Sequence, residues 1–223
     1  MVNSRSSAVG SPSERCRGMC GHVGRGAPRV HPGRPFLDTH REVLAAMDFF
    51  TVPTLTFGFL YVLLIIQHDR RKVRLVNVTA HPTSAWVSRQ LRAAFPFADA
   101  FRYLVMDRDA IFSAEVCRVL RHLYVQPVRT SFQSPWQNGV AERWVGTCRR
   151  ELLDHVIVLS EAHLRRLLRE FLEYYHNDRT HLSLGKDPPY GQAVGPSSST
   201  TASVTSVPRI GGLHHRYEWN EAA

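Results

Sequence analysis

The segment SPWQNGVAER, residues 134–143, places a loop directly before a basic helix. Its proline, asparagine and glycine are typical of turns, and a carboxylate, Glu142, follows on the first turn of the predicted helix. An acid at a helix start often only offsets the positive end of the helix dipole, so Glu142 alone indicates little. Two other acids give it weight, because Asp48 and Asp107 lie at the ends of strongly apolar runs.

The composition favours a globular protein with a polyanionic partner. With 223 residues, 43% of them hydrophobic, the chain can hold one domain with flanking tails, or two small domains. Its net charge of +9 favours nucleic acid over a membrane surface. Of 28 basic residues only Lys72 and Lys186 are lysines, an excess of arginine that fits phosphate binding and equally a GC-rich genome.

Simple features of the chain disfavour several classes of protein. The apolar run from Leu55 to Ile66 is shorter than the roughly 20 residues that span a membrane, and the N-terminus lacks the apolar core of a signal peptide. We therefore expect a soluble, cytoplasmic protein without a membrane partner. The four cysteines are too scattered for a disulfide framework. Cys16, Cys20 and His22 lack a fourth ligand at any usual zinc spacing.

Composition divides the chain into three parts. Residues 1–43 are rich in Ser, Gly, Pro and Arg without a sustained period, which predicts a disordered segment or a remnant of a longer region. Residues 44–192 carry the periodic apolar patterns of a folded core. Pro, Gly, Ser and Thr dominate from Pro188 onward, so we expect residues 193–223 to form an extended tail.

The first part of the core predicts antiparallel strands. Residues 46–52 and 57–68 are apolar, β-branched or aromatic, and residues 73–79 alternate. The short links between the three segments imply a meander.

The second part predicts parallel crossovers. Thr83 is a suitable N-cap for a helix ending near Phe95, and strands at 101–106 and 124–129 flank a helix at 113–123. The sum is an α/β fold with a mixed sheet, three antiparallel strands followed by βαβ units, and helices on both faces.

Two helices follow this sheet. The first continues from Glu142 to about Leu153, and the second begins at Ser160, a good N-cap. The second helix carries an amphipathic stripe that we assign to core packing. Its members are Leu164, Leu167, Leu168, Phe171, Leu172 and Tyr175.

Three converging carboxylates would need cations to offset their repulsion. Ligands that are all oxygen favour Mg²⁺ or Mn²⁺ over zinc, and two such ions can promote phosphoryl transfer. The basic charge would then neutralise a DNA backbone. A glycosidase also uses two carboxylates, but that function leaves the positive charge unexplained. For Asp48 a structural role, paired with an arginine or capping a turn, stays open.

The chain resembles DDE integrases of the retroviral type and insertion-sequence transposases. The resemblance spans about residues 45–217, and 34 residues separate Asp107 from Glu142. The segments that carry it are MDFFTV (47–52), MDRDAIF (106–112), SPWQNGVAER (134–143), GTCRRE (146–151), YHNDRTHLSL (175–184) and GGLHHRY (211–217).

This resemblance implies an RNase H-like fold and a metal-dependent polynucleotidyl transferase. Water cleaves the end of the mobile element, and the freed 3′-hydroxyl then attacks target DNA. Asp48, Asp107 and Glu142 would be the catalytic residues and would hold two Mg²⁺ or Mn²⁺ ions. In the family's pattern the first Asp of the Asp-Arg-Asp run is the ligand, so Asp109 ranks behind Asp107. DNA and further copies of the chain are the implied partners.

Three arginines and one asparagine complete the candidate site. Arg149 stands seven residues after Glu142, hence on the same helix face, and we expect it to contact DNA phosphate. Arg143 and Arg150 lie more to the side, and for Arg150 a solvated helix face is an equal alternative. Asn138 is included as a DNA-binding candidate, although shaping the loop is its simpler role.

One departure from the family bears on activity. Relatives carry a helix-turn-helix region before the catalytic domain, and residues 1–40 have no such pattern. The chain therefore resembles a catalytic-domain fragment that acts with a separate helix-turn-helix protein, or an inactive remnant that only binds DNA. A host ribonuclease of the same fold is a third hypothesis.

Overall fold

The computed structural model describes residues 39–95, 101–130, 135–191 and 203–220. All of them belong to one compact unit, Gly33–Ala223. The candidate zinc ligands Cys16, Cys20 and His22, and the predicted N-terminal segment as far as residue 38, lie outside the described residues.

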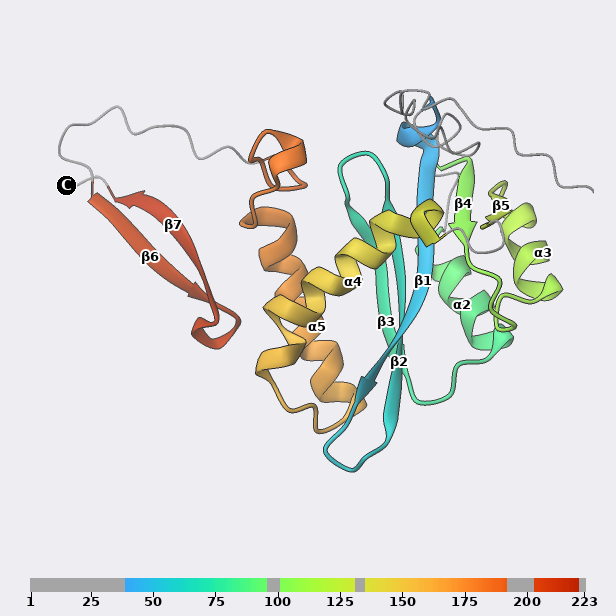
Figure 1. The fold of residues 1–223 in the computed structure, drawn as a ribbon, viewed down its shortest axis with the longest axis horizontal. Helices are drawn as coiled ribbons and strands as arrows, with labels where there is room; N and C mark the ends of the chain where they lie inside the picture. Colours follow the sequence, from blue (N-terminus) through green and yellow to red (C-terminus); the bar gives the residue numbers. More distant parts are fainter. Residues whose placement is uncertain (1–38, 96–100, 131–134, 192–202, 221–223) are drawn as a thin grey trace, which may run out of the picture. The chain divides into compact units, whose positions relative to one another are not determined.

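A five-stranded mixed sheet forms the centre of the fold, with strand order β3-β2-β1-β4-β5 (Figure 1). Strands β1 (Leu44–Pro53), β2 (Phe59–Gln67) and β3 (Val73–Thr79) pair antiparallel. Strands β4 (Tyr103–Met106) and β5 (Gln126–Arg129) continue the sheet parallel to β1. The predicted meander followed by parallel strands is confirmed.

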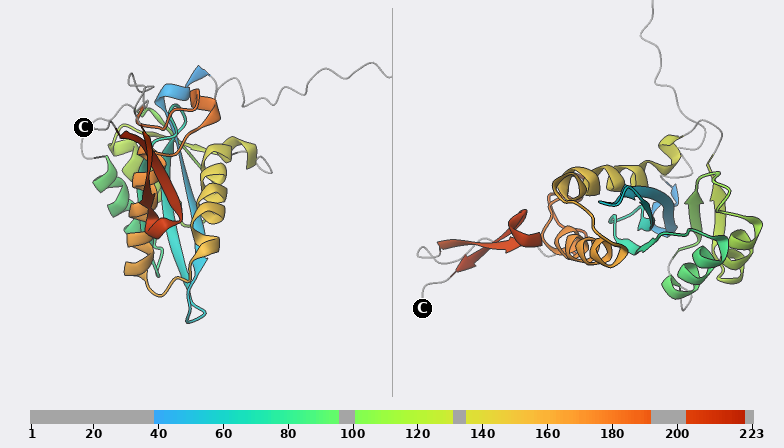
Figure 2. Two further views of the ribbon diagram at one scale, coloured as in Figure 1. Left: turned by 90° about the vertical axis from the view of Figure 1, so that its left-hand side faces the viewer. Right: turned by 90° about the horizontal axis from the view of Figure 1, so that it is seen from below.

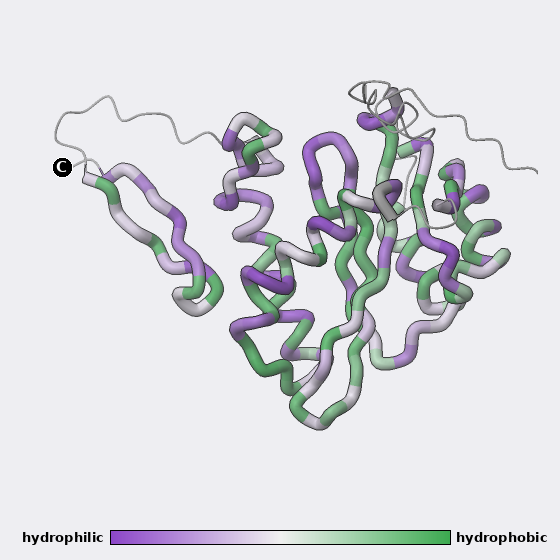
Figure 3. Tube along the Cα trace, in the orientation of Figure 1, coloured by the Kyte–Doolittle hydropathy of each residue, from purple (hydrophilic) through white to green (hydrophobic). Residues whose placement is uncertain are grey.

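Helices cover both faces of this sheet, as predicted (Figure 2). Helices α2 (Ser84–Ala94) and α3 (Ala114–His122) pack on one face, and α4 (Gly139–Glu151) and α5 (Glu161–Asn177) on the other. Each face has its own hydrophobic cluster, because successive side chains of a strand point to opposite sides. The apolar residues of the central strands that supply both clusters are visible in Figure 3.

The alternation along β1 fixes the side of the sheet on which its polar residue lies. Ala45 and Met47 belong to the cluster under α2 and α3, whereas Ala46 and Phe50 belong to the cluster under α4 and α5. Asp48 has the parity of Ala46 and Phe50, so its carboxylate lies on the α4 side of the sheet.

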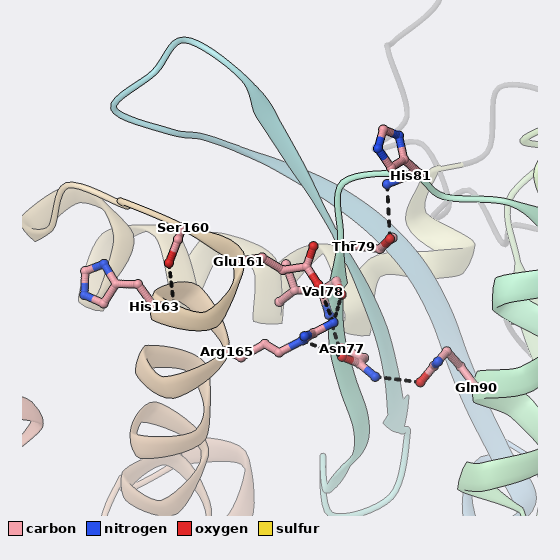
Figure 4. A network of polar contacts seen from close by, with 9 residues as sticks. All are labelled: Asn77, Val78, Thr79, His81, Gln90, Ser160, Glu161, His163 and Arg165. Carbon is pink, nitrogen blue, oxygen red and sulfur yellow. Dashed lines mark hydrogen bonds and ion pairs between the residues drawn. The ribbon is translucent and has the colours of Figure 1, made fainter.

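Both predicted N-caps are present. The Thr83 hydroxyl accepts from the amide of Trp86 at 3.1 Å, and the Ser160 hydroxyl accepts from the amide of His163 at 3.2 Å. The predicted apolar stripe of α5 lies in the core, with Leu172 only partly buried. Arg165, at the edge of this stripe, donates to the carbonyl of Val78 at 2.6 Å and so attaches α5 to β3 (Figure 4).

The C-terminal part contains an element that the sequence analysis did not anticipate. Strands β6 (Ser203–Arg209) and β7 (His214–Asn220) pair antiparallel as a separate two-stranded sheet. Gly211 and Gly212 take φ values of 64° and 92° in the connection, a conformation that glycine adopts without strain. This Gly-Gly pair between two alternating segments is the hairpin signal that compositional reasoning passed over.

Short 3₁₀ helices complete the fold. One of them, η2, directly precedes α4, which begins at Gly139 and carries Glu142 on its first turn, as predicted. No helix in the described ranges is long and apolar enough to cross a membrane. The 3₁₀ helices are η1 (Arg41–Val43), η2 (Pro135–Asn138), η3 (Leu153–His155), η4 (Leu182–Leu184) and η5 (Ile210–Gly212).

Candidate active site

Three neighbouring parallel strands bring polar side chains into one row. Met47 of β1 pairs with Met106 of β4, and Met106 pairs with Arg129 of β5. The next residue on each strand is therefore Asp48, Asp107 and Thr130. Because paired residues of parallel strands point to the same face, and adjacent strands lie about 4.8 Å apart, the two carboxylates are immediate neighbours.

Thr130 fixes the orientation of the second carboxylate. Its hydroxyl donates to Asp107 Oδ1 at 3.2 Å, and its amide bonds to the carbonyl of Met106. Arg108 donates to the Thr130 carbonyl at 2.9 Å. The sequence analysis missed Thr130. The sequence signal that could have identified Thr130 is its position directly after β5, which matches the position of Asp107 directly after β4.

Glu142 approaches the row from the first turn of α4. The buried residues of this helix are Ala141, Trp144, Thr147 and Cys148, and Glu142 is exposed. At the start of the helix, the fully buried Asn138 donates from Nδ2 to the carbonyl of Met47 at 3.4 Å. The beginning of α4 is thus attached to β1 one residue before Asp48.

The pKa shifts of Asp48 and Glu142 indicate that these acids act on one another. The pKa of Asp48 is raised to about 7, chiefly by burial and also by the charges of Asp107, Glu142 and Asp109, against the opposing hydrogen bond from the Phe49 amide. Burial, followed by the charge of Asp107, also raises the pKa of Glu142. Within the described part of the chain, no ion pair offsets any of these four carboxylates.

Asp109, the alternative to Asp107, forms its hydrogen bonds within its own loop. Its carboxylate accepts from the Ile111 amide at 2.9 Å, and its carbonyl accepts from the Phe112 amide. Asp109 also acts on Asp48 less than the other two acids do. This geometry favours Asp107 as the member of the site.

The chemistry of these acids suits a hard divalent cation, although their side chains are not close enough together to surround one. Among the described residues no group of three or more His, Cys, Asp or Glu side chains is close enough to hold a metal ion. Asp48 and Asp107 are adjacent, while Glu142 lies within electrostatic range of both. An uncompensated set of carboxylate oxygens nevertheless has the chemistry that Mg²⁺ or Mn²⁺ requires.

The predicted DNA-binding arginines divide into two kinds. Arg149 donates to the Thr51 carbonyl at 3.0 Å and lies 5.8 Å from the centre of the Phe50 ring, so it attaches α4 to β1. Arg143 and Arg150 are exposed, and with Glu142, Gly139 and Gly146 they line an open groove along α4. Asn138, at 0% exposure, fits the loop-shaping role and not a direct DNA contact.

Comparisons with known proteins bear on the fold. Residues 123–189 match the family model described as an integrase core domain. A chain of the simian T-cell lymphotropic virus intasome, solved in complex with PP2A regulatory subunit B56 gamma, aligns with a TM-score of 0.55 at 13% identity, covering 81% of this chain and 67% of that one. No curated protein matches the sequence.

The integrase catalytic core of HTLV-2 in complex with magnesium aligns in two forms. The dimeric form gives a TM-score of 0.52 at 12% identity and covers 68% of this chain and 95% of that one. The trimeric form gives 0.51 at 13% identity and covers 67% and 94%. The RNase H-like fold and the resemblance to an integrase catalytic core are thereby confirmed.

Proposed function

We propose that this chain cleaves DNA at the end of a mobile element and joins the freed 3′-hydroxyl to target DNA, with Asp48, Asp107 and Glu142 as its catalytic residues. The observation that carries the proposal is the strand register, which makes Asp48 and Asp107 neighbours on the face covered by α4. Residues 44–192 would form the catalytic core.

Asp48, Asp107 and Glu142 would hold two Mg²⁺ or Mn²⁺ ions. These ions would supply stabilisation of the attacking and leaving oxygens during phosphoryl transfer. The HTLV-2 integrase core was solved with magnesium, which supports the choice of metal. Because burial raises its pKa to about 7, Asp48 would release a proton near neutral pH when a cation binds.

The other residues of the site have positioning and binding roles in this proposal. Thr130 holds the Asp107 carboxylate through its hydroxyl, and Asn138 holds the first turn of α4, and with it Glu142, against β1. Arg143 and Arg150 would bind DNA phosphates in the groove along α4. Arg149 would act indirectly, by keeping α4 on the sheet.

The partners follow from the chemistry and the net charge of +9. They would be the element ends and the target DNA, and the cytoplasmic chain would associate with the nucleoid when it is bound to DNA. The chain would act there as an oligomer, since the viral relatives include an intasome and dimeric and trimeric cores. A separate helix-turn-helix protein would supply recognition of the element ends.

Strand transfer on terminal-repeat DNA tests the proposal. The wild-type chain should cleave and join this DNA with Mg²⁺ or Mn²⁺, and Asp107→Asn should abolish both steps. The alternative, an inactive remnant that only binds DNA, predicts salt-sensitive binding without turnover. Preferential cleavage of an RNA–DNA hybrid would instead favour a ribonuclease.

A further inference from the structure

Helix α4 carries a glycine, Gly146, in its interior. The helix runs from Gly139 to Glu151, so Gly146 lies more than one turn from either end. Glycine is the least favourable residue of a helix interior after proline, because it loses the most conformational freedom on folding. A glycine at this position therefore lowers the stability of the helix, and either the fold or a ligand has to account for it.

The fold does not require this glycine. Gly146 is helical and is not among the residues with positive φ, so its backbone conformation suits any residue. It is also not among the buried residues of α4 that pack on the sheet. The three atoms nearest to a Cβ added at Gly146 all belong to Arg150, with Nη1 closest at 3.1 Å. That atom is the far end of a flexible, exposed side chain, so alanine would fit after a small shift of Arg150.

Gly146 lies on the floor of the open groove along α4. The residues that line this groove recur at helical spacing and form one stripe of the helix. They are Gly139, Glu142, Arg143, Gly146 and Arg150. Charged side chains stand on both sides of Gly146, whereas at Gly146 itself the groove reaches the helix backbone. A ligand in the groove can therefore touch the main chain of α4 at this point, which is a common use of glycine.

The arginines of the groove are not neutralised by acids. Arg143 and Arg150 are exposed, and in the ranges that the structure describes neither forms an ion pair. Burial, followed by the charge of Arg143, lowers the pKa of Arg71, which places a third guanidinium from the β2–β3 turn in the same neighbourhood. Glu142 is the carboxylate of the groove. Such a group of cations favours a ligand with successive negative charges, which is the chemistry of a nucleic-acid backbone.

We propose that Gly146 is a close-approach position, at which the sugar-phosphate backbone of DNA lies directly against the main chain of α4. Arg143 and Arg150 bind phosphates on either side, and a side chain at position 146 would hold the DNA away from them. A helix that is less stable than it could be is thus explained by its ligand, as is common at functional sites. The inference rests on the proposed function, because it takes DNA as the ligand of the groove, but it does not require cleavage.

Fluorescence anisotropy with a labelled DNA duplex, in the absence of divalent metal, measures binding apart from cleavage. In the full chain, Gly146→Ala should lower DNA affinity about threefold and Gly146→Gln about tenfold, because the larger side chain keeps the DNA further from α4. Both variants should melt about 1–3 °C higher than the wild type, since alanine and glutamine favour a helix more than glycine does. Opposite changes in stability and binding are the signature of a close-approach glycine.

Two controls make the test specific. Ala162→Gln adds bulk without charge at an exposed position of α5, and DNA affinity should stay unchanged. The Arg150→Ala background separates direct approach from displacement of the Arg150 side chain. Gly146→Gln should weaken binding in this background as well. If its effect disappears there, the glycine acts by placing Arg150 and the proposal is wrong.

The outcomes also separate this inference from the proposed function. Wild-type affinity in Gly146→Gln would overturn the inference even if the chain nicks DNA. A lower melting temperature in both variants would overturn it too, because the fold would then need the glycine. Weaker binding by a stable Gly146→Gln variant, in a chain that does not cut DNA, would support the inference and contradict the proposed function. A wild-type chain that binds no DNA would overturn both.

Discussion

Asp48 is the residue whose environment departs most from what its side chain prefers. It is a carboxylate in the middle of a strand, half-buried beside Asp107, with a pKa raised from 3.8 to about 7. Sequence reasoning could identify Asp48 as unusual within an apolar run. It could not predict the register that makes Asp107 and Thr130 its neighbours, because register depends on pairing between distant segments.

Replacing the Asp48 carboxylate should stabilise the metal-free protein. Because its pKa is raised in the folded state, ionisation of Asp48 costs stability as pH rises from about 4 through about 7. Asp48→Asn keeps an oxygen for the Phe49 amide and should raise the free energy of unfolding by about 1–3 kcal/mol at pH 8. Near pH 4 the variant and the wild type should be equally stable. Urea unfolding at both pH values measures this difference, and a less stable variant at pH 8 would contradict it.

Substitutions of two arginines in α4 should have different effects, one on the stability of the fold and the other on DNA binding. Arg149→Ala removes the bond to Thr51 and the contact with Phe50, and should lower the free energy of unfolding by about 1 kcal/mol. Arg143→Ala removes an exposed charge, so stability should stay unchanged while DNA affinity and its salt dependence fall. Thermal unfolding and fluorescence anisotropy report the two effects. Equal loss of stability in both variants would refute the distinction.

At the scale of elements, the helices and the five strands of the main sheet could be predicted, and the C-terminal hairpin was missed. Thr83 and Ser160 identify two helix starts, and the stripe of α5 identifies its buried face. These are local features of the sequence. The hairpin of β6 and β7 had a local signal in Gly211 and Gly212, but its attachment to the core is not local and could not be predicted. Arg209 pairs with Asp178 at 2.8 Å, and His214 bonds to the carbonyl of Glu151 at 2.7 Å.

The hairpin should depend on Asp178, whose side chain is only 3% exposed and is shared by Arg209 and Arg216. Asp178→Asn removes the charge that holds both arginines, and two-stranded hairpins are only marginally stable alone. Amide exchange in residues 203–220 should accelerate at least tenfold, while exchange in α4 stays unchanged. Hydrogen–deuterium exchange with mass spectrometry measures both. Unchanged protection of the hairpin would show that Asp178 does not hold it.

On the scale of the whole molecule, acid should destabilise the fold through buried histidines. Burial lowers the pKa of His68, His176 and His181 to about 4. Since their unfolded value is near 6.5, the unfolded chain binds more protons between these limits, and stability is lost as pH falls from 6.5 to 4. Asp48 has the opposite sign, so the measurement belongs in the Asp48→Asn background.

A single substitution separates this effect from general acid unfolding. His176 Nε2 accepts from the Val73 amide at 2.9 Å, and His176→Gln can retain an acceptor without titrating. Urea midpoints between pH 7 and pH 4.5 should fall less steeply in this variant than in its parent. Parallel profiles would exclude His176 from the acid response.

The fold class followed from the sequence because alternation and turns report it directly. The candidate site followed in part, since Asp48, Asp107 and Glu142 could be identified from their segments. Their mutual geometry could not, and neither could the burial of Asn138 or the use of Arg149 within the fold. Those outcomes depend on how α4 packs on β1.

The central claim is that the three carboxylates form one metal-dependent site that cuts DNA. Nicking of a supercoiled plasmid with Mn²⁺ tests it without knowledge of the element ends. We predict nicking by the wild-type chain and by Asp109→Asn, and at least a hundredfold loss in Asp48→Asn, Asp107→Asn and Glu142→Gln. Nicking by Asp107→Asn at the wild-type rate, together with its loss in Asp109→Asn, would contradict the claim.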